Sequence, residues 1–329
     1  MIDLAVVIVS WNTRDLVVQA IRSLLEDVST SGLAVQVWLV DNASTDGTVE
    51  AVQTAFPGVK VIASRENLGF VRGNNAALRA IGFDSADGTV PPADLPRAVY
   101  LLNPDTITTS GATRTLYNAL MDNPKIGLVG AHLSYEDGSF QHGAFAFPGL
   151  RQIWVEFFPT PGRLIEGRFN GRYPRALYDH GQPFPVDFVL GATMMLKREI
   201  IEKTGLFDES FFMYCEEIDW AWRIHKAGWG VSCVPAAHVV HLAGKSTGQV
   251  RALSVERLWT SRLHLYEKHQ PRWKVWAARR LIAWGMQRKL RALGVMTPEN
   301  QPLAEAYQRV RGLALGKTAL MTTGEKQPV

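Results

Sequence analysis

The first 135 residues alternate short β-branched runs with longer amphipathic stretches, and this alternation limits the folds open to the chain. The apolar runs are bounded by turn residues, as buried strands are, while several intervening stretches have helical spacing. Strands that alternate with helices form βαβ units, which build a mostly parallel sheet, so we predict an α/β domain. The predicted strands are LAVVIVS (4–10), VQVWLVDN (35–42), VKVIAS (59–64), AVYLLN (98–103) and IGLVGAHL (126–133), with helices over 13–28 and 70–83.

Composition narrows the classes of protein further. A chain of 329 residues with 47% hydrophobic content suffices for one large domain with an appendage, or for two modest domains. Its net charge of +4 suits an anionic substrate or surface without requiring nucleic acid. Cys215 and Cys233 are the only cysteines, which excludes a disulfide framework and a four-sulfur metal site and fits a reducing compartment. The amino terminus, MIDLAVVIVSWN, has no basic flank, so we interpret it as a buried first strand without a signal peptide.

Polar residues stand where three of the predicted strands end. Ser10 follows the first strand, Asp41 the second and Asp105 the fourth. Ligands of parallel sheets bind beyond these ends, so Asp41 is placed to accept from a nucleobase or ribose, and Asp105 to hold a divalent cation. Helix capping and turns explain the same residues taken singly. His241, after another apolar run, offers a nitrogen ligand if the fold brings it near Asp105, although a single His is usually structural.

Two later segments do not show the alternation of strands and helices predicted for the first 135 residues. Residues 136–187 are rich in Gly, Pro and aromatic residues, which indicates a long ordered loop or lid in contact with the acceptor. From residue 255 to 291, tryptophans alternate with cations, and only Glu256 and Glu267 oppose them. Such a basic helix lies at a membrane interface or packs on the main domain with a solvated basic face, and both interpretations remain open. Residues 321–329 are predicted to be a frayed tail.

Seven motifs occur together in one order. They are VVIVSWN (6–12), VDNASTDGT (40–48), NLGFVRGNN (67–75), LLNPDT (101–106), LGATMMLKRE (190–199), GLFDESFFMYCEEIDWAWRIHKAGW (205–229) and VVHLAGKS (239–246). In order and spacing, this set resembles the family 2 inverting glycosyltransferases, and within them the bacterial rhamnosyltransferase-like branch. The resemblance covers residues 3 to 250, and the ordered set is highly specific.

The resemblance implies a GT-A fold, a Rossmann-like sheet that is mixed and mostly parallel, flanked by helices and followed by a carboxyl-terminal helical extension. It implies a transferase domain over 1–254, with a nucleotide-sugar-binding half (1–110) and an acceptor and catalytic half (111–254). Residues 255–329 are then a basic, Trp-rich extension that ends in the flexible tail.

The resemblance assigns donor binding residue by residue. In NLGFVRGNN, Arg72 would meet a phosphate and Gly69 would let the backbone approach closely. Gly191 would leave room beneath the sugar or acceptor, although turns and strand bulges explain such glycines equally well. The assigned nucleotide-sugar residues are Ser10, Trp11, Asp41, Asn67, Gly69, Arg72, Asn74 and Asn103, and the assigned sugar or acceptor pocket is Gly191, Ala192 and Glu216.

Three carboxylates lie among aromatic residues in FMYCEEIDWAWR (212–223). An inverting transferase needs a base that takes the proton of the acceptor hydroxyl as it attacks the anomeric carbon. In the family, the base lies in a Glu-Asp pair followed two positions on by another acid; here the pair reads Glu216-Glu217, with Asp219 following. Position matching makes Glu217 the general base and Asp219 the second candidate. Asp219 is alternatively expected to orient the acceptor or to pair with Arg223, at i+4 on a helix.

The resemblance also implies a metal site. It places Asp105 at the last acid of a DxD motif and His241 at a histidine that some members use as a further ligand. Asn103 stands where the first acid usually stands, so the site would borrow ligands from the donor phosphates and from water. A divalent cation stabilises the charge that builds on a leaving diphosphate, and oxygen ligands with one imidazole suit Mg²⁺ or Mn²⁺.

These features predict an inverting, metal-dependent glycosyltransferase. It would move a sugar, rhamnose favoured, from a dTDP- or UDP-sugar to a hydroxyl of a glycan in cell-surface polysaccharide or cell-wall assembly. The expected acceptor is carried on a polyprenyl diphosphate at the cytoplasmic face of the plasma membrane, with peripheral contact through 255–291 and no nucleic-acid partner.

Two other function classes remain open at this point. One is a sugar nucleotidyltransferase, although SWNTRD (10–15) lacks the glycines of a phosphate loop after the first strand. The other is a catalytically silent binding or assembly subunit, which the departures from the family at Asn103 and Glu217 favour. Release of a nucleoside diphosphate from a sugar donor distinguishes an enzyme from such a subunit.

Overall fold

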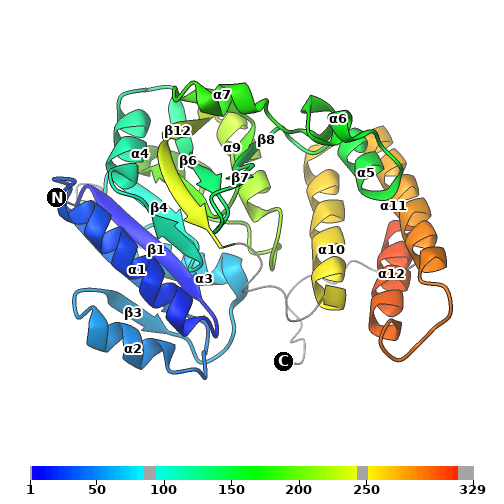
Figure 1. The fold of residues 1–329 in the computed structure, drawn as a ribbon, viewed down its shortest axis with the longest axis horizontal. Helices are drawn as coiled ribbons and strands as arrows, with labels where there is room; N and C mark the ends of the chain where they lie inside the picture. Colours follow the sequence, from blue (N-terminus) through cyan, green and yellow to red (C-terminus); the bar gives the residue numbers. More distant parts are fainter. Residues whose placement is uncertain (1, 85–93, 243–250, 318–329) are drawn as a thin grey trace.

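A computed structural model of the protein describes residues 2–84, 94–242 and 251–317. The described chain forms a sheet domain flanked by helices and, beside it, a lobe made of helices alone (Figure 1). The lobe combines the last three helices of the described residues with a short helix from the middle of the chain.

One large mixed sheet runs through the sheet domain. Its strands and the two-stranded sheet beside it comprise β1 (Leu4–Ser10), β2 (Val35–Asp41), β3 (Lys60–Ala63), β4 (Ala98–Leu102), β5 (Thr106–Thr108), β6 (Ile126–Ser134), β7 (Phe140–Gln141), β8 (Ala144–Phe145), β9 (Phe184–Val186), β10 (Phe188–Val189), β11 (Thr193–Lys197) and β12 (Gly230–His241). The order in the large sheet is β3-β2-β1-β4-β11-β6-β12-β5. The pairs β3-β2, β2-β1, β1-β4 and β6-β12 are parallel, whereas β11 is antiparallel to both neighbours. This is the mixed, mostly parallel sheet that the resemblance implies.

The first three strands end level with one another. Ser10 pairs with Asp41, and Asp41 pairs with Ala63, so their carboxyl ends form one edge. All seven residues of β1 are buried, because the sheet is covered on both faces, and this is why its sequence is a continuous apolar run. The five predicted strands match β1, β2, β3, β4 and β6 to within one residue at either end.

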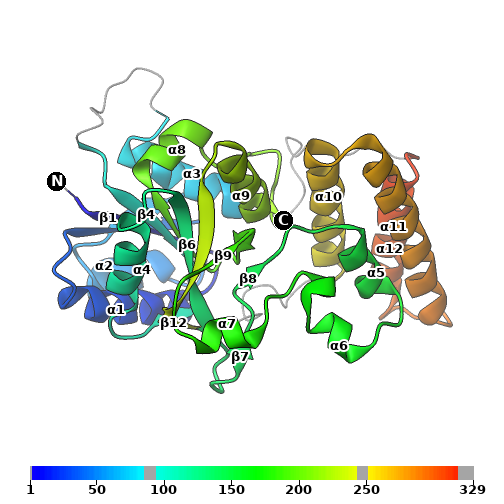
Figure 2. The same ribbon diagram turned by 90° about the horizontal axis from the view of Figure 1, so that it is seen from above.

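Helices cover both faces of the sheet. They are α1 (Arg14–Ser29), α2 (Thr48–Ala55), α3 (Gly69–Ile81), α4 (Ala112–Met121), α8 (Arg198–Thr204) and α9 (Glu216–Lys226). Figure 2 shows α1, α2 and α4 on one side and α3, α8 and α9 on the other. Each side has its own buried cluster: Ile21 and Leu116 belong to the first, and Leu78, Ile200 and Trp220 to the second.

The segment predicted to be a long ordered loop contains short regular elements. It holds β7, β8 and β9 together with α5 (Leu150–Phe157), α6 (Gly162–Ile165), a 3₁₀ turn (Arg168–Asn170) and α7 (Arg175–Asp179). The stretch 158–174 is irregular apart from α6 and the 3₁₀ turn, as expected. Helix α5 escaped prediction, and it leaves the sheet domain to join the helical lobe.

The helical lobe consists of α5, α10 (Arg251–His269), α11 (Arg272–Ala292) and α12 (Gln301–Ala314). These helices share a third buried cluster, which includes Phe157, Trp259, Ile282 and Val310. Gly285 lies where α11 meets α5, and a side chain there would collide with the Phe157 ring. The helices of the basic segment therefore pack into a core, and they also carry exposed tryptophans. Contact of this segment with a membrane stays a prediction.

No helix within the described ranges is long and apolar enough to cross a bilayer. Two sequence predictions lie outside those ranges: the end of the VVHLAGKS motif, from residue 243, and the frayed tail over 321–329.

Candidate functional site

The ends of β1 and β2 present polar groups at the edge of the sheet. Ser10 is buried, and its hydroxyl hydrogen-bonds that of Thr13 at 2.9 Å, while Trp11 is exposed. Asp41 is buried, and its Oδ2 accepts a hydrogen bond from the Ser44 amide. Its Oδ1 accepts none from the described residues. A buried carboxylate oxygen without a donor is suited to a ligand with hydroxyl or N–H groups.

The NLGFVRGNN segment packs closely against the turn that precedes α9. Asn67 Oδ1 accepts from the Gly69 amide, and Asn42 Nδ2 donates to the Gly69 carbonyl at 3.1 Å. Gly69 has a φ of +74°, and a Cβ there would lie 3.1 Å from the Phe212 carbonyl oxygen. Both facts require glycine. The predicted donor loop therefore contacts the segment that carries the acids.

Two other residues predicted to bind the donor lie on α3. Arg72 is partly exposed, and its Nε lies 3.8 Å from a carboxylate oxygen of Glu209. Asn74 is buried, and its amide donates to the Phe70 carbonyl one turn earlier in the same helix. The structure thus leaves Arg72 accessible and uses Asn74 within the helix.

The DxD-like motif and His241 come together, although 135 residues separate them. Asp105 and His241 are both buried, and Asp105 Oδ1 lies 3.5 Å from His241 Nε2. The neighbouring backbone fixes this approach, because the Leu242 amide donates to the Asp105 carbonyl at 2.8 Å. Gln141 Oε1 lies 3.2 Å from His241 Nδ1 and so orients the ring. The condition set for His241 as a ligand, proximity to Asp105, is met.

This pair fits a divalent cation. Asp105 Oδ1 is buried and accepts no hydrogen bond from the residues the structure describes. A carboxylate oxygen beside an imidazole nitrogen is a donor set that Mg²⁺ and Mn²⁺ accept. Among the described residues, no group of three or more His, Cys, Asp or Glu side chains has the geometry of a metal site. The protein would therefore supply a minority of the ligands, as Asn103 in place of an acid already implies.

Residues 190–192 lie between this edge and the acids of α9. The Asn103 amide donates to the Ala192 carbonyl at 3.0 Å, which ties the segment to the end of β4. On the other side, the nearest atom to a Cβ built on Gly191 is Glu217 Cβ, at 3.9 Å. Asn103, Gly191 and Glu217 therefore follow one another across the site.

A strained turn delivers the acids to this position. Tyr214 and Cys215, directly before α9, have φ values of +69° and +68°, which non-glycine residues seldom adopt. Asn12 and Ala43, after β1 and β2, also have positive φ, so four of the five such non-glycine residues described lie at the predicted site. Backbone strain of this kind gathers at functional sites, where the surrounding fold enforces it.

Glu216 and Glu217 occupy the first turn of α9, where Glu216 is buried and Glu217 is partly exposed. Burial raises the pKa of Glu217 to about 7, with a smaller opposing effect from backbone hydrogen bonds and from Arg262 of α10. Burial and the neighbouring Glu217 charge raise the pKa of Glu216 well above its usual value. Glu216 is buried, and its Oε2 has no hydrogen-bond partner among the described residues. A carboxylate whose pKa lies near neutrality can accept a proton from a hydroxyl and release it again.

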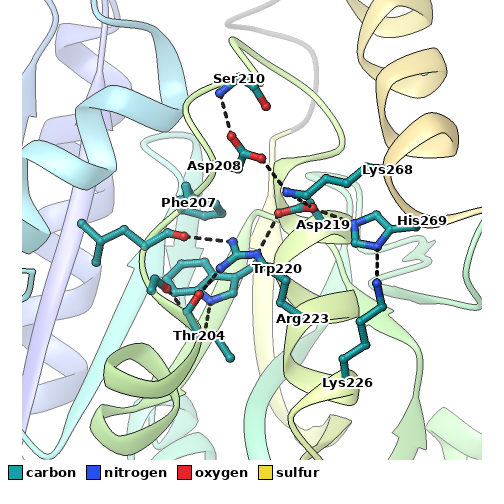
Figure 3. A network of polar contacts seen from close by, with 12 residues as sticks. Thr204, Phe207, Asp208, Ser210, Asp219, Trp220, Arg223, Lys226, Lys268 and His269 are labelled. Atoms are coloured by element: carbon teal, nitrogen blue, oxygen red, sulfur yellow. Dashed lines mark hydrogen bonds and ion pairs between the residues drawn. The ribbon is translucent and has the colours of Figure 1, made fainter.

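Asp219 has the opposite environment (Figure 3). Its side chain is fully buried and lies 2.9 Å from Arg223 Nε, 2.7 Å from Lys268 Nζ and 2.7 Å from His269 Nε2. Burial alone would raise the pKa of Asp219, but the His269 hydrogen bond and the charges of Arg223 and Lys268 hold it far below its usual value. The predicted pairing with Arg223 at i+4 is confirmed. Both carboxylate oxygens already have partners, so the geometry favours a structural role for Asp219.

The partners from α10 were missed by sequence reasoning. Lys268 and His269 lie about 50 positions from Asp219 in the chain, so no local spacing links them. His269 also stacks on the Trp222 ring, with centroids 4.8 Å apart, and accepts from Lys226 through Nδ1 at 3.2 Å. The one available signal was the cationic character of residues 255–291, which we interpreted as a surface property.

Comparison with known sequences places the chain among glycosyltransferases. The profile of Glycosyl transferase family 2 matches residues 5–205. The N-acetylglucosaminyl-diphospho-decaprenol L-rhamnosyltransferase of Mycobacterium tuberculosis is 29% identical over 258 residues, which cover 76% of this chain and 81% of that protein. The low-salt glycan biosynthesis hexosyltransferase Agl10 of Haloferax volcanii is 27% identical and covers 73% of this chain and 67% of that protein.

Solved structures share the fold. GalNAc-T7, crystallised with UDP, GalNAc and Mn²⁺, superposes with a TM-score of 0.56 at 13% identity, over 96% of this chain and 56% of that one. The mannosyltransferase PcManGT of Pyrobaculum calidifontis, in complex with GDP-Man and Mn²⁺, gives 0.53 at 17% identity, over 95% of this chain and 84% of that one. Together with the sequence match, they show that this chain belongs to glycosyl transferase family 2 and is a glycosyltransferase of the GT-A fold.

Proposed function

We propose that this protein transfers a sugar, rhamnose favoured, from a dTDP- or UDP-sugar to a hydroxyl of a polyprenyl-diphosphate-linked glycan, with inversion at the anomeric carbon. The observation that carries the proposal is Glu217: an acid at the start of α9 whose pKa burial raises to about 7, and whose Cβ lies 3.9 Å from a Cβ built on Gly191. Cell-surface polysaccharide or cell-wall assembly is the process that such a product would serve.

In this proposal Glu217 is the general base. Its carboxylate takes the proton of the acceptor hydroxyl while the hydroxyl oxygen forms a bond to the anomeric carbon. The bond from that carbon to the donor diphosphate breaks on the opposite side, and the nucleoside diphosphate leaves. Gly191 leaves space for the reacting groups, because no atom lies closer than 3.9 Å to a Cβ built there.

The donor would lie across the carboxyl edge of the sheet. Asp41 Oδ1, buried and without a donor among the described residues, would accept from the nucleoside, and the accessible Arg72 guanidinium would meet a phosphate. Asp105 and His241 would hold a divalent cation, Mg²⁺ or Mn²⁺, whose chemistry is to stabilise negative charge on the leaving diphosphate. Support for a cation also comes from the two Mn²⁺-bound structures that share the fold.

The choice of acceptor rests on the relative from Mycobacterium tuberculosis, whose name gives a decaprenol-linked acceptor and a rhamnosyl donor group. An acceptor of this kind resides in a membrane. The protein would therefore work at the cytoplasmic face of the plasma membrane as a peripheral enzyme.

The test has two stages. Thermal unfolding is measured with a panel of nucleotide sugars, each with Mn²⁺ and with EDTA, because a ligand that binds only the folded state raises its melting temperature. We expect stabilisation by a dTDP- or UDP-sugar that disappears in EDTA. Transfer from that donor to polyprenyl-diphosphate-N-acetylglucosamine is then followed by mass spectrometry, and the anomeric configuration of the product by NMR. A product that retains the donor configuration, or stabilisation that EDTA leaves unchanged, would contradict the proposal.

Replacement of the metal-site carboxylate gives a sharper version of the first stage. Asp105→Ala should weaken Mn²⁺-dependent donor binding by at least about tenfold, because it removes a metal ligand from a site with few of them. Asp122→Ala, an acid at the carboxyl end of α4, is the matched control and should leave the titration unchanged. An unaltered Mn²⁺ dependence of donor binding in Asp105→Ala would show that Asp105 is not a metal ligand.

A further inference from the structure

Helix α11 is strongly cationic and carries three of the ten tryptophans of the chain. Over Arg272–Ala292 it has seven Lys and Arg residues and neither Asp nor Glu. A helix that only packs on a neighbour has no need for such a charge imbalance, because self-repulsion along the helix opposes its formation. The composition indicates a partner that is negatively charged and tolerates aromatic insertion.

The two faces of α11 differ sharply. Ala278, Ile282 and Met286 are buried against the lobe core. On the opposite face, Trp273, Trp276 and Trp284 are 62%, 63% and 57% exposed. These tryptophans recur with a spacing of three and eight residues, which keeps them on one side of a helix with 3.6 residues per turn. Exposure at this level for three aromatic side chains in one row is a costly arrangement in water.

The exposed row continues onto α5. Trp154 is 40% exposed, and its ring centroid lies 4.4 Å from that of Phe158, which in turn lies 4.6 Å from that of Trp284. The contacts join two segments that are 126 positions apart into one surface. Of the eight large exposed hydrophobic side chains among the described residues, six belong to this lobe or to the loop after α11: Trp154, Trp273, Trp276, Trp284, Val295 and Met296.

Cations border the tryptophans. Lys274 lies over the Trp273 ring at 5.6 Å from its centroid, and Arg280 over the Trp276 ring at 5.7 Å. Arg288 and Arg291 are exposed further along the helix. Tryptophan rings prefer the headgroup level of a bilayer, and Lys and Arg there are attracted to anionic lipid. The cations and the exposed tryptophans of α11 therefore both fit the headgroup region of a bilayer that contains anionic lipid.

We propose that the row Trp154, Trp273, Trp276 and Trp284, with Arg280, Arg288 and Arg291, docks this protein on the surface of a bilayer that contains anionic lipid. The inference deepens the proposed function by assigning the residues that would bring the site to a membrane-borne acceptor. Docking itself requires neither donor nor acceptor. A docked lobe would hold the site near the membrane, because Lys268 and His269 of α10 bind Asp219 of α9 (Figure 3).

The test uses the full-length protein and vesicles without nucleotide sugar or glycan. Co-flotation is measured with vesicles of phosphatidylcholine alone and with 3:2 phosphatidylcholine to phosphatidylglycerol. We expect binding to the anionic vesicles, a blue shift of tryptophan emission on binding, and weakening by salt. Trp273→Ala/Trp276→Ala/Trp284→Ala and, separately, Arg280→Glu/Arg288→Glu/Arg291→Glu should each weaken binding at least about tenfold. The matched control is Tyr135→Ala, an exposed aromatic residue of the sheet domain, which should bind like the wild type.

Several results would overturn the inference. They are absence of binding to either vesicle, equal binding to both, and unchanged binding by both triple variants. Dimerisation through the tryptophan row, seen by light scattering and lost in the tryptophan variant while vesicle binding is absent, would assign the face to a second copy of the chain.

A transfer assay separates this inference from the proposed function. Both triple variants should retain wild-type rates with a water-soluble acceptor analogue and lose rate only with acceptor in vesicles. Failure of the wild type to use any nucleotide sugar, with vesicle binding intact, would refute the proposed function and leave the docking surface standing.

Discussion

The first turn of α9 exposes similar acids to two opposite environments. In one environment, burial raises the pKa of Glu216 and Glu217, and no hydrogen-bond donor among the described residues reaches Glu216 Oε2. Toward α10, Asp219 is held well below its usual pKa by His269, Arg223 and Lys268. Environments that push neighbouring pKa values apart assign neighbouring acids to different tasks. Glu217 is suited to proton transfer, and Asp219 joins the helical lobe to the sheet domain.

The largest expected effect comes from removing the base. Glu217→Gln should lower the transfer rate by about 10²–10⁴-fold, the usual contribution of general base catalysis, while donor binding stays within about twofold. The melting temperature should stay equal or rise, because a poorly solvated carboxylate is replaced by a neutral group. Single-turnover kinetics and calorimetric donor titration give the two quantities. Glu50→Gln, an exposed acid of α2, is the matched control. A wild-type rate in Glu217→Gln would show that Glu217 is not the general base.

Replacing the partnered acid should act on stability first. Asp219→Asn should lower the free energy of unfolding by about 3–5 kcal/mol, because it removes a fully buried carboxylate from the partly buried Arg223 and Lys268 and from the buried His269. Denaturant unfolding measures it, and the control Asp15→Asn, an exposed partner of Arg14, should cost less than about 1 kcal/mol.

The difference in the free energy of unfolding between wild type and Asp219→Asn should depend on pH. The pKa of Asp219 is depressed in the folded protein, so its contribution is present above the unfolded value and is lost as the pH falls. The gap between wild type and Asp219→Asn should therefore narrow on acidification below about pH 4. A gap independent of pH, or a fully stable but inactive Asp219→Asn, would argue that Asp219 serves the reaction directly.

A pH–rate profile of the wild-type protein tests the role of Glu217 without mutation. Because Glu217 must be ionised to accept a proton, kcat/KM should rise with pH and level off above about 7, the pKa to which burial raises it. Below that value the rate should fall about tenfold for each pH unit. Thermal unfolding measured at each pH checks that the protein stays folded. Repeating the assay at a higher cation concentration checks that the cation is not lost. A profile that is flat between pH 5.5 and 8.5 would place the base elsewhere.

The smallest expected effect concerns the space in front of Glu217. Gly191→Ala should leave the melting temperature unchanged, because the added methyl meets nothing closer than Glu217 Cβ at 3.9 Å. It should raise KM a fewfold by narrowing the gap between Asn103 and Glu217. Gly130→Ala is the contrasting variant: its Cβ would lie 2.6 Å from Val189, and overpacking of this kind costs about 1–3 kcal/mol. Loss of stability in Gly191→Ala, with KM unchanged, would mean that the glycine serves packing alone.

Prediction from sequence succeeded where the signal is local. Strands β1, β2, β3, β4 and β6 match their predicted ranges because buried parallel strands are continuous apolar runs that end at turn residues. The Arg223 partner of Asp219 was predictable for the same reason, since i+4 neighbours on a helix face each other. The family resemblance then supplied the fold and the enzyme class from motif order.

Prediction failed where distant segments meet. Helix α5 was hidden in a Gly- and Pro-rich stretch, and its attachment to α11 depends on Phe157 packing over Gly285. Lys268 was counted among the cations of the basic segment and His269 was not considered, although both reach Asp219. Trp259 is buried, whereas Trp273, Trp276 and Trp284 are exposed, and the alternation of Trp with cations did not separate them.

By itself, the sequence determined the buried strands of the mostly parallel part of the sheet, the order of the motifs and the residue types at each strand end, because these depend on patterns within a few positions along the chain. Only the tertiary structure decided what those residues experience. It placed His241 beside Asp105, gave Glu217 a pKa near 7, paired Asp219 with α10, and left one row of tryptophans in solvent. Solvation, charge pairing and exposure depend on atoms within a few ångströms, and folding draws those atoms from anywhere in the chain.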